Sequence, residues 1–338
     1  MIKVAINGYG RIGRIAHRVI LEKYKSEIDI VAINAGSSSD TKGWLNLLKY
    51  DSVYGILNGH ALEVKGRAFV VDGKEIPVYS EKEATQLPWQ ALDVDVVIES
   101  TGKFTTEDKL QAHLTAGAKK VVLSAPAKGG NVSTFVISVN DKGYKGENLI
   151  NNASCTTNCV APVAKIMVSN FGVEKAMMTT IHAYTSDQRL LDGGHKDPRR
   201  ARSAAINIVP TSTGATIATG EAVPELSGIF AGLSIRVPVP VGSLSDFTFV
   251  LKKDTTVEEI NEVFKKEAKK PENEGILEVT NEPIVSSDIV GNPHSAIIDL
   301  SLTQVVGGNM AKVIAWYDNE YAYANRLVEE VLLIGNFK

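Results

Sequence analysis

Cysteine is scarce in this sequence. The 338 residues contain only two, Cys155 and Cys159, which are four positions apart. Two thiols cannot form a disulfide framework, and a bridge between them at helical spacing is not expected, so the chain does not fit the class of small disulfide-bonded secreted domains. We expect a reducing, cytoplasmic compartment, since a sparse cysteine can stay a free thiol there.

Long apolar runs, a leader segment and a strong charge imbalance are also absent. No apolar run reaches the roughly 18–20 residues that cross a bilayer, and residues 1–7 lack the regions of a secretory signal. The formal net charge is −3, which gives no electrostatic reason to expect nucleic acid or an anionic membrane as a partner. The cysteines and the six histidines lack the spacing of structural zinc sites, so we expect no metal.

The composition is that of an ordinary globular protein, 44% hydrophobic and 22% charged, and the length favours two domains. In the first half, short apolar runs alternate with helical stretches, as in βαβ units around a parallel sheet. The second half has longer β-rich segments and fewer helices, which indicates an α+β domain with a mostly antiparallel sheet. We therefore predict an α/β fold: a doubly wound parallel sheet in residues 1–153, an α+β domain in 154–319, and a C-terminal helix in 320–338 that packs back on the first domain.

The patterns assign individual elements to both halves. In the first half we expect strands at 2–7, 28–34, 94–99, 121–124 and 134–139, and helices at 11–24 and 109–116. In the second half we expect strands at 176–183, 229–237, 245–252, 296–302 and 312–317, and helices at 156–171, 257–269 and 320–333.

A glycine-rich turn follows the first predicted strand and opens the first predicted helix. Gly8, Gly10 and Gly13 have the spacing G-x-G-x-x-G. In this context the first glycine makes a tight turn, the second lets the backbone approach a pyrophosphate, and the third allows close packing of helix on strand. The helix N-terminus adds free N–H groups for the phosphates. A purely structural turn is the alternative, but the context favours a dinucleotide site of the Rossmann type.

The usual acidic partner of such a site is missing. A carboxylate that binds the adenosine ribose is expected about 20 residues after the glycines. Here the second strand ends at Asn34 and Ala35, and no carboxylate occurs before Asp40. Without that charge, and with hydroxyls at Ser37–Ser39, the site is predicted to accept NADP as well as NAD. The alternative is that Asn34 or the backbone holds the ribose of NAD.

Cys155 begins a predicted helix, immediately after a predicted strand end at 148–152. The dipole of a helix N-terminus favours the thiolate and makes a cysteine reactive. A small buried hydrophobe is the alternative, which Cys159, one turn deeper, fits better. A thiolate nucleophile needs a base or a cation beside it. His182 closes a β-rich run and precedes a polar loop, where site residues usually lie, although a surface or buried structural histidine is the alternative.

Ten stretches, in order along essentially the whole chain, resemble those of phosphorylating glyceraldehyde-3-phosphate dehydrogenases. The most specific is Ala153-Ser-Cys-Thr-Thr-Asn-Cys159. The others are Asn7–Arg14, Leu48–Ser52, Ser100–Phe104, Ser124–Lys128, His182–Thr185, His195–Arg202, Pro210–Gly214, Arg236–Pro240 and Trp316–Glu320. The resemblance implies a homotetramer and a reversible reaction of glycolysis and gluconeogenesis, with residues 154–319 as the catalytic domain.

The resemblance also implies a reaction and residue roles. Glyceraldehyde 3-phosphate would be oxidised with NAD or NADP, and inorganic phosphate would convert the product to 1,3-bisphosphoglycerate. Cys155 would attack the aldehyde and later carry a thioester, while His182 would take the proton and polarise the oxyanion. Thr185 and Arg236 would bind the substrate phosphate, with Asp187 orienting the arginine. The attacking phosphate would be held by Ser154, Thr156, Arg200, Thr213 and Gly214.

The cofactor contacts implied by the resemblance include two departures from the usual pattern. Ala35 stands where the family usually has Asp, and Gly193-Gly194 stands where NAD-specific members commonly have Leu-Pro, and both changes favour NADP. Asn319 would hydrogen-bond the nicotinamide carboxamide, with Tyr323 beside the ring. The full set of matching positions is Gly8, Gly10, Arg11, Ile12, Gly13, Asn34, Ala35, Lys82, Thr101, Ser124, Asn319 and Tyr323.

Two other functions compete with this prediction. Erythrose-4-phosphate dehydrogenase shares the cysteine and the histidine but typically changes two other motifs, and Ala183–Thr185 and Thr213-Gly214 are both intact here. A non-catalytic nucleotide- or RNA-binding member of the family would need a damaged thiol site. None is visible in the sequence.

Overall fold

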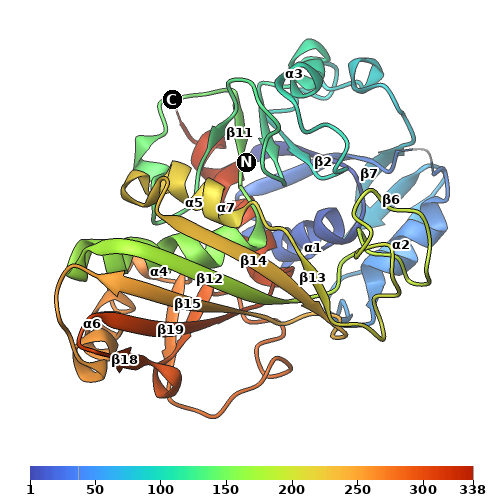
Figure 1. Ribbon diagram of the computed structural model, residues 1–338. Helices are drawn as coiled ribbons and strands as arrows, with labels where there is room; N and C mark the ends of the chain where they lie inside the picture. The colour runs from blue at the N-terminus through green and yellow to red at the C-terminus, as the bar shows by residue number, and fades with distance from the viewer. Residues whose placement is uncertain (37, 338) are drawn as a thin grey trace. The chain divides into compact units, whose positions relative to one another are not determined.

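The structure, a computed structural model, describes residues 1–36 and 38–337 (Figure 1). The chain forms two compact units. The first contains Met1–Phe135, Gly143–Ala153 and Ala324–Lys338, and the second contains Val136–Lys142 and Ser154–Tyr323. No helix in the described part of the chain is long and apolar enough to cross a membrane.

The first unit is built on a nine-stranded sheet in the order β10-β11-β9-β8-β1-β2-β7-β6-β5. All ladders from β10 to β7 are parallel, while β5, β6 and β7 form an antiparallel edge. The predicted doubly wound parallel sheet is confirmed, and β1 and β2 have the predicted bounds. The strands are β1 (Ile2–Asn7), β2 (Ile28–Asn34), β5 (Leu62–Lys65), β6 (Ala68–Val71), β7 (Lys74–Tyr79), β8 (Val96–Glu99), β9 (Lys120–Leu123), β10 (Ser133–Thr134) and β11 (Leu149–Asn151), with a separate hairpin of β3 (Tyr50–Asp51) and β4 (Gly55–Ile56).

Four helices contribute to this unit: α1 (Arg11–Val19), α2 (Thr41–Lys49), α3 (Glu107–Thr115) and most of α7 (Tyr321–Gly335). The predicted helix at 11–24 is α1 followed by a π-helical turn, Ile20–Tyr24. Sequence patterns did not predict α2, which begins where the Asp40 carboxylate accepts the Gly43 N–H at 2.8 Å. At the other end of the chain, Lys120 Nζ donates to the Ile334 carbonyl at 2.7 Å, which ties the last turn of α7 to β9.

The predicted strand at 134–139 is wrong. Only Ser133–Thr134 is a strand, and the chain then turns, because the Val139 N–H bonds the Val136 carbonyl and the Asn140 side chain accepts the Val136 N–H. Lys165 donates to the carbonyls of Ser138 and Val139, at 2.9 and 2.7 Å. These bonds hold residues 136–142 on the second unit, whereas the sequence prediction placed them in the first domain.

The second unit contains an eight-stranded sheet in the order β13-β14-β12-β15-β19-β17-β16, with β18 also paired to β19. The β12–β14 and β16–β17 pairs are parallel and the other ladders are antiparallel, so the predicted mostly antiparallel sheet is confirmed. The strands are β12 (Val173–Ala183), β13 (Val209–Thr211), β14 (Phe230–Val237), β15 (Ser243–Leu251), β16 (Leu277–Thr280), β17 (Ala296–Asp299), β18 (Gln304–Val306) and β19 (Met310–Tyr317).

Helix α4 (Cys155–Phe171) packs on one face of this sheet, against β12, β15, β17 and β19 (Figure 1). Its buried Val163 and Met167 join Phe247 and Phe249 of β15 in one core cluster. Burial of side chains of this size contributes roughly 1.5–3 kcal/mol each. The buried apolar side chains along α4 therefore anchor the first turn of the same helix, which carries Cys155. The remaining helices of the unit are α5 (Ala215–Ala222) and α6 (Val257–Glu267).

Candidate active site

Cys155 is the first residue of α4, and local hydrogen bonds determine where the helix begins. Ser154 is the N-cap, and its hydroxyl accepts the Thr157 N–H at 3.0 Å. The preceding residue, Ala153, has a left-handed backbone with φ 49°, a strained conformation for a residue with a Cβ. The side chain of Asn151 accepts the Ala153 N–H at 3.0 Å and holds this turn. The sharp turn places the thiol at the start of the helix.

His182 lies beside the thiol. It is next to the last residue of β12 and is buried, and its Nε2 is 3.3 Å from Cys155 Sγ. Its Nδ1 is 2.6 Å from the Ala183 carbonyl, which can only accept. Arg236 Nη1, which can only donate, also approaches Nδ1, at 3.1 Å. The shorter contact, to the carbonyl, favours a proton on Nδ1, which leaves the lone pair of Nε2 toward the thiol. This tautomer is the one that a general base needs.

Burial and charge act in opposite directions on this pair. Burial raises the pKa of the Cys155 thiol, while the Arg236 guanidinium and the N–H groups at the start of α4 act to lower it. The helix N-terminus acts in the predicted direction, but burial has the larger effect, so the pKa of the thiol is raised. Burial and Arg236 together lower the pKa of His182 to about 3, so the free imidazole is neutral.

Arg236, on β14, has unused hydrogen-bonding capacity near the histidine. Its Nη1 lies 3.3 Å from the Ala183 carbonyl and 3.4 Å from the Thr185 hydroxyl. Its Nε is buried and has no partner among the residues that the structure describes. A buried guanidinium donor without an acceptor is costly, and an anion such as a phosphate would satisfy it.

The predicted role of Asp187 is not supported by its contacts. Its carboxylate pairs with Arg200 Nη1 at 2.6 Å and lies 3.5 Å from His195 Nε2. It therefore orients Arg200, whose Nε also donates to the Thr211 hydroxyl at 2.9 Å. Arg200, thirteen residues along the chain, thus takes the carboxylate, and Asp187 acts on Arg236 through its charge.

The other predicted phosphate ligands start two helices of the second unit. Gly214 is the N-cap of α5, and the hydroxyl of Thr213 accepts the Ala215 N–H at 3.1 Å. The hydroxyl of Thr156 is bound to the buried Tyr317 hydroxyl at 2.9 Å, so it is turned into the core. The hydroxyl is thus already engaged, and Thr156 has its backbone N–H in the first turn of α4 to offer to a phosphate.

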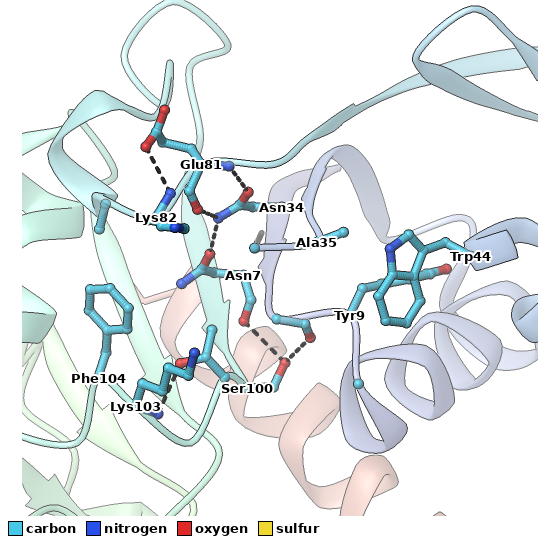
Figure 2. A pocket seen from close by; sticks show the side chains of 15 residues that line it. Asn7, Tyr9, Asn34, Ala35, Trp44, Glu81, Lys82, Ser100, Lys103 and Phe104 are labelled. Carbon is cyan, nitrogen blue, oxygen red and sulfur yellow. Dashed lines mark hydrogen bonds between the residues drawn. The ribbon is translucent and has the colours of Figure 1, made fainter. Parts of the chain in front are cut away.

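A separate cavity of about 420 Å³ lies in the first unit, at the carboxyl ends of β1, β2 and β8 (Figure 2). Six of the predicted cofactor positions line it: Gly8, Gly10, Asn34, Ala35, Lys82 and Thr101. Arg11, Ile12, Gly13 and Ser124 are not among the lining residues, and Arg11 is paired with Asp51 at 2.5 Å. The other lining residues were not predicted, although five of them lie in the family stretches 7–14 and 100–104: Asn7, Tyr9, Ser100, Lys103 and Phe104. The remaining four, outside those stretches, are Gly36, Trp44, Glu81 and Ala84.

The three glycines of the turn have different steric surroundings. A Cβ on Gly8 would lie 2.5 Å from the Thr101 nitrogen, and one on Gly13 would lie 2.2 Å from the Gly8 carbonyl oxygen. Nothing lies within 4 Å of a Cβ placed on Gly10. Gly8 and Gly13 are thus required by the packing of the turn, while Gly10 leaves open space beside its backbone. Such space fits a bound pyrophosphate.

No carboxylate from the end of β2 lines this cavity. Asn34 uses both hydrogens of its amide on Asn7 Oδ1 and the Glu81 carbonyl, at 2.7 and 2.9 Å, so its predicted hydrogen bond to a ribose is not supported. Asp40 caps α2, and Ala35 presents a methyl group to the cavity. Of the predicted hydroxyls, Ser37 lies outside the described residues.

Asn319 and Tyr323 belong to the second unit and are buried. Asn319 Oδ1 accepts the Gly242 N–H at 3.1 Å and the Ser243 hydroxyl at 2.9 Å. Its amide nitrogen has no acceptor among the described residues, so the amide is oriented with a donor to spare.

Comparison with known protein families gives two matches that cover most of the chain. Residues 2–107 match the NAD binding domain of glyceraldehyde 3-phosphate dehydrogenase, and residues 154–319 match the C-terminal domain of that enzyme. The chain belongs to the glyceraldehyde 3-phosphate dehydrogenase family. Membership makes it an oxidoreductase that uses NAD or NADP.

Relatives of similar length support the family assignment. The chain is 49% identical over 337 residues to "Glyceraldehyde-3-phosphate dehydrogenase 2" of Streptomyces avermitilis, covering 99% of each chain. It is 51% identical over 335 residues to glyceraldehyde-3-phosphate dehydrogenase of Borreliella burgdorferi, covering 97% of this chain and 98% of the relative. The corresponding enzyme of Thermotoga maritima is 50% identical over 335 residues, covering 99% of each.

Proposed function

We propose that this family member oxidises glyceraldehyde 3-phosphate and couples the oxidation to inorganic phosphate, giving 1,3-bisphosphoglycerate in a reversible reaction. The observation that carries the proposal is the contact of Cys155 Sγ with His182 Nε2 at 3.3 Å, beside an arginine with a buried unpaired donor. These are a nucleophile, its base and an anion ligand on one side of one sheet.

Cys155 and His182 carry the covalent steps. As the sulfur–carbon bond to the aldehyde forms, the thiol proton moves to Nε2, and the resulting imidazolium donates to the oxygen of the thiohemiacetal. When bound, the dinucleotide supplies a hydride acceptor at C4 of its nicotinamide ring. Loss of hydride from the oxyanion leaves a thioester on Cys155. Attack by phosphate then breaks the sulfur–carbon bond, and the proton held on His182 returns to the sulfur.

Two sets of residues would bind the phosphates. Arg236 and Thr185 suit the phosphate of the aldehyde, since both lie beside His182 and Arg236 has a free donor. The backbone at Thr213 and Gly214, where α5 begins, and the backbone N–H groups at Ser154 and Thr156 suit the attacking phosphate. Arg200 adds a positive charge, although Asp187 already accepts one of its N–H groups.

The cavity of the first unit is the proposed site of the adenosine and pyrophosphate. The glycine turn, with Arg11, Ile12 and Gly13 at the start of α1, would hold the pyrophosphate, and Ala35 and Lys82 would face the adenosine. Thr101 and Ser124 follow the ends of β8 and β9 and would complete the site. The spare donor of Asn319 fits the nicotinamide carboxamide, with Tyr323 nearby in sequence.

We infer that the enzyme accepts NADP as well as NAD. The support is the methyl group of Ala35 where a carboxylate would repel a 2′-phosphate, together with Lys82 in the same cavity. Measurement of kcat/KM with both cofactors tests this inference, and a large preference for NAD would contradict it.

We propose that the chain forms the homotetramer that the family resemblance implies, because several large apolar side chains are exposed. Leu190 and Leu191 are 75% and 77% exposed, and Ile206 and Ile208 are 79% and 70% exposed. Clusters of this kind mark protein interfaces. Sedimentation at micromolar concentration should give a tetramer, and a monomer would contradict the proposal.

Both cysteines are free thiols. The reaction needs this state at Cys155, and the proposed cytoplasmic location maintains it.

The deciding assay for the reaction compares the two sugar phosphates with and without inorganic phosphate. We expect turnover of glyceraldehyde 3-phosphate that requires phosphate. The relatives described above are named for this enzyme, and erythrose-4-phosphate dehydrogenase is not favoured. Faster, phosphate-independent turnover of erythrose 4-phosphate would overturn the proposal.

A further inference from the structure

A buried carboxylate that the reaction does not use lies at the edge of the cofactor cavity. Glu99 is the last residue of β8 and is fully buried. It is in register with Asn7, the last residue of β1, which is in turn in register with Asn34, the last residue of β2. Three polar side chains thus end three adjacent parallel strands, at the edge where such sheets bind ligands.

Four hydrogen-bond donors surround the Glu99 carboxylate. Oε1 accepts the N–H of Thr101 at 2.8 Å and its hydroxyl at 2.5 Å. Oε2 accepts Asn7 Nδ2 at 2.5 Å and His113 Nε2 at 3.1 Å. An ionised carboxylate accepts all four bonds, and they offset the cost of burying its charge.

Trp89 determines which nitrogen of His113 carries the proton. Its indole Nε1 can only donate, and it lies 3.1 Å from His113 Nδ1. Nδ1 must therefore accept, so Nε2 carries the proton and donates to Glu99. Both His113 and Trp89 are fully buried, and their role lies in this contact rather than at the surface.

The same bonds orient the wall of the cavity. With its amide nitrogen on Glu99, Asn7 presents Oδ1 to Asn34 Nδ2 at 2.7 Å. Asn34 then holds the backbone of Glu81 by two bonds of 2.9 Å, one to its N–H and one to its carbonyl. Figure 2 shows Asn34 lying between Asn7 and Glu81 in this chain of bonds. Four residues that are linked to Glu99, either directly or through successive hydrogen bonds, line the cavity: Asn7, Asn34, Glu81 and Thr101.

We propose that Glu99 and His113 are positioning residues for the dinucleotide. They hold Asn7 and Thr101, and through Asn34 the Glu81 segment, in the arrangement that receives the adenosine half. This inference rests on the proposed placement of the cofactor in this cavity. An apolar pair of the same size would preserve the core of the sheet but would leave the amide of Asn7 and the hydroxyl of Thr101 free to turn.

The test compares Glu99→Gln and His113→Leu with the matched control His113→Gln, which keeps one donor and one acceptor. For each variant we would measure the Kd of NAD by calorimetry, kcat at saturating cofactor, and the rate of alkylation of Cys155 without cofactor. We expect Kd to rise about tenfold in the first two variants, as for the loss of a hydrogen bond to a charged group. The control should stay within about twofold of the native Kd, and kcat and alkylation should be unchanged in all three.

The outcomes separate this inference from the proposed cofactor site. If Gly10→Ala weakens NAD binding but Glu99→Gln and His113→Leu do not, the positioning role is overturned and the site stands. If Gly10→Ala has no effect either, the cofactor binds elsewhere. An equal loss in His113→Gln and His113→Leu would reduce the role of His113 to packing and overturn the inference. Should Glu99→Gln not fold, Trp89→Phe removes the indole donor together with part of the buried ring, and an unchanged Kd in that variant would also contradict the inference.

Discussion

At the scale of single residues, three contacts determine the chemistry of the reactive cysteine. The Ala183 carbonyl fixes the tautomer of His182, the histidine presents Nε2 to the thiol, and Arg236 supplies the nearby positive charge. Each contact involves a residue at or near the end of a strand or the start of a helix, where main-chain geometry is held by the sheet. Arg236 and the start of α4 therefore oppose burial, which has the larger effect on the pKa of the thiol, and His182 is placed to take its proton.

The charge of Arg236 can be tested through the reactivity of the thiol. Arg236→Leu removes the cation that lowers the pKa of Cys155, so the pH profile for alkylation by iodoacetamide should move to higher pH. Arg202→Leu is the matched control, since Arg202 is exposed and pairs with Asp192. A profile that is the same in Arg236→Leu and the native enzyme would show that Arg236 does not act on the thiol.

Ala35 offers a second test at this scale. Ala35→Asp would place a carboxylate in the cavity and repel the 2′-phosphate of NADP, so kcat/KM with NADP should fall at least about tenfold while that with NAD is kept or improved. Steady-state kinetics with both cofactors measure the effect. An equal change for the two cofactors would remove Ala35 from the account of specificity.

The candidate site was predictable from the sequence only where a motif names the residue. Cys155 and His182 were singled out by position and confirmed as neighbours by their contact. The partners of Asp187 and Thr156 were not predictable, because a carboxylate or hydroxyl in a loop or first helical turn has several donors within reach. The fold selects Arg200 for the first and Tyr317 for the second.

At the scale of elements, periodicity predicted the strands that are buried on one or both faces. β1 and β2 match the predictions residue for residue, and β12, β14, β15 and β19 differ only at their ends. Helix α2 was missed because its start depends on a single side-chain cap, Asp40. The error at 134–139 has a related cause, since apolar composition there does not reveal that the backbone turns on itself.

The glycine turn between β1 and α1 gives a prediction at this scale. Gly13→Ala would force a Cβ against the Gly8 carbonyl, and should lower the free energy of unfolding by about 1–3 kcal/mol, as overpacking does. Gly10→Ala meets no protein atom, so thermal stability should stay unchanged while the Kd of NAD rises, since the methyl group occupies space meant for the pyrophosphate. Calorimetry measures the Tm of each variant, and titration measures its Kd for NAD. A lower Tm in Gly10→Ala, or weaker NAD binding only in Gly13→Ala, would contradict the assigned glycine roles.

At the scale of the whole molecule, each unit contains a histidine buried in its neutral form. Burial is the largest cause that lowers the pKa of His17 in the first unit and of His182 in the second, in each case to about 3. In the unfolded chain a histidine titrates near its ordinary value of roughly 6.5. Stability is therefore fully present above that pH and is lost as the pH falls from there toward the folded pKa.

The pH dependence of unfolding tests this account. At pH 5 each buried histidine should reduce the free energy of unfolding by about 2 kcal/mol relative to neutral pH. His17→Gln removes one of the two contributions, so its stability should fall less steeply between about pH 7 and about pH 5, which lie on either side of the ordinary histidine pKa. Urea denaturation at a series of pH values measures this fall. Parallel curves for the variant and the native enzyme would mean that His17 binds its proton as readily in the folded as in the unfolded chain, and would contradict the account.

The central claim is that Cys155 forms a thioester which only phosphate resolves at a useful rate. Its most direct test mixes the enzyme with glyceraldehyde 3-phosphate and NAD in the absence of phosphate, and follows reduced cofactor together with the mass of the peptide that contains Cys155. We predict a burst of one reduced cofactor per chain, an acyl adduct on Cys155, and steady turnover only after phosphate is added. Continued turnover without phosphate, or a burst that persists in Cys155→Ser, would contradict the account.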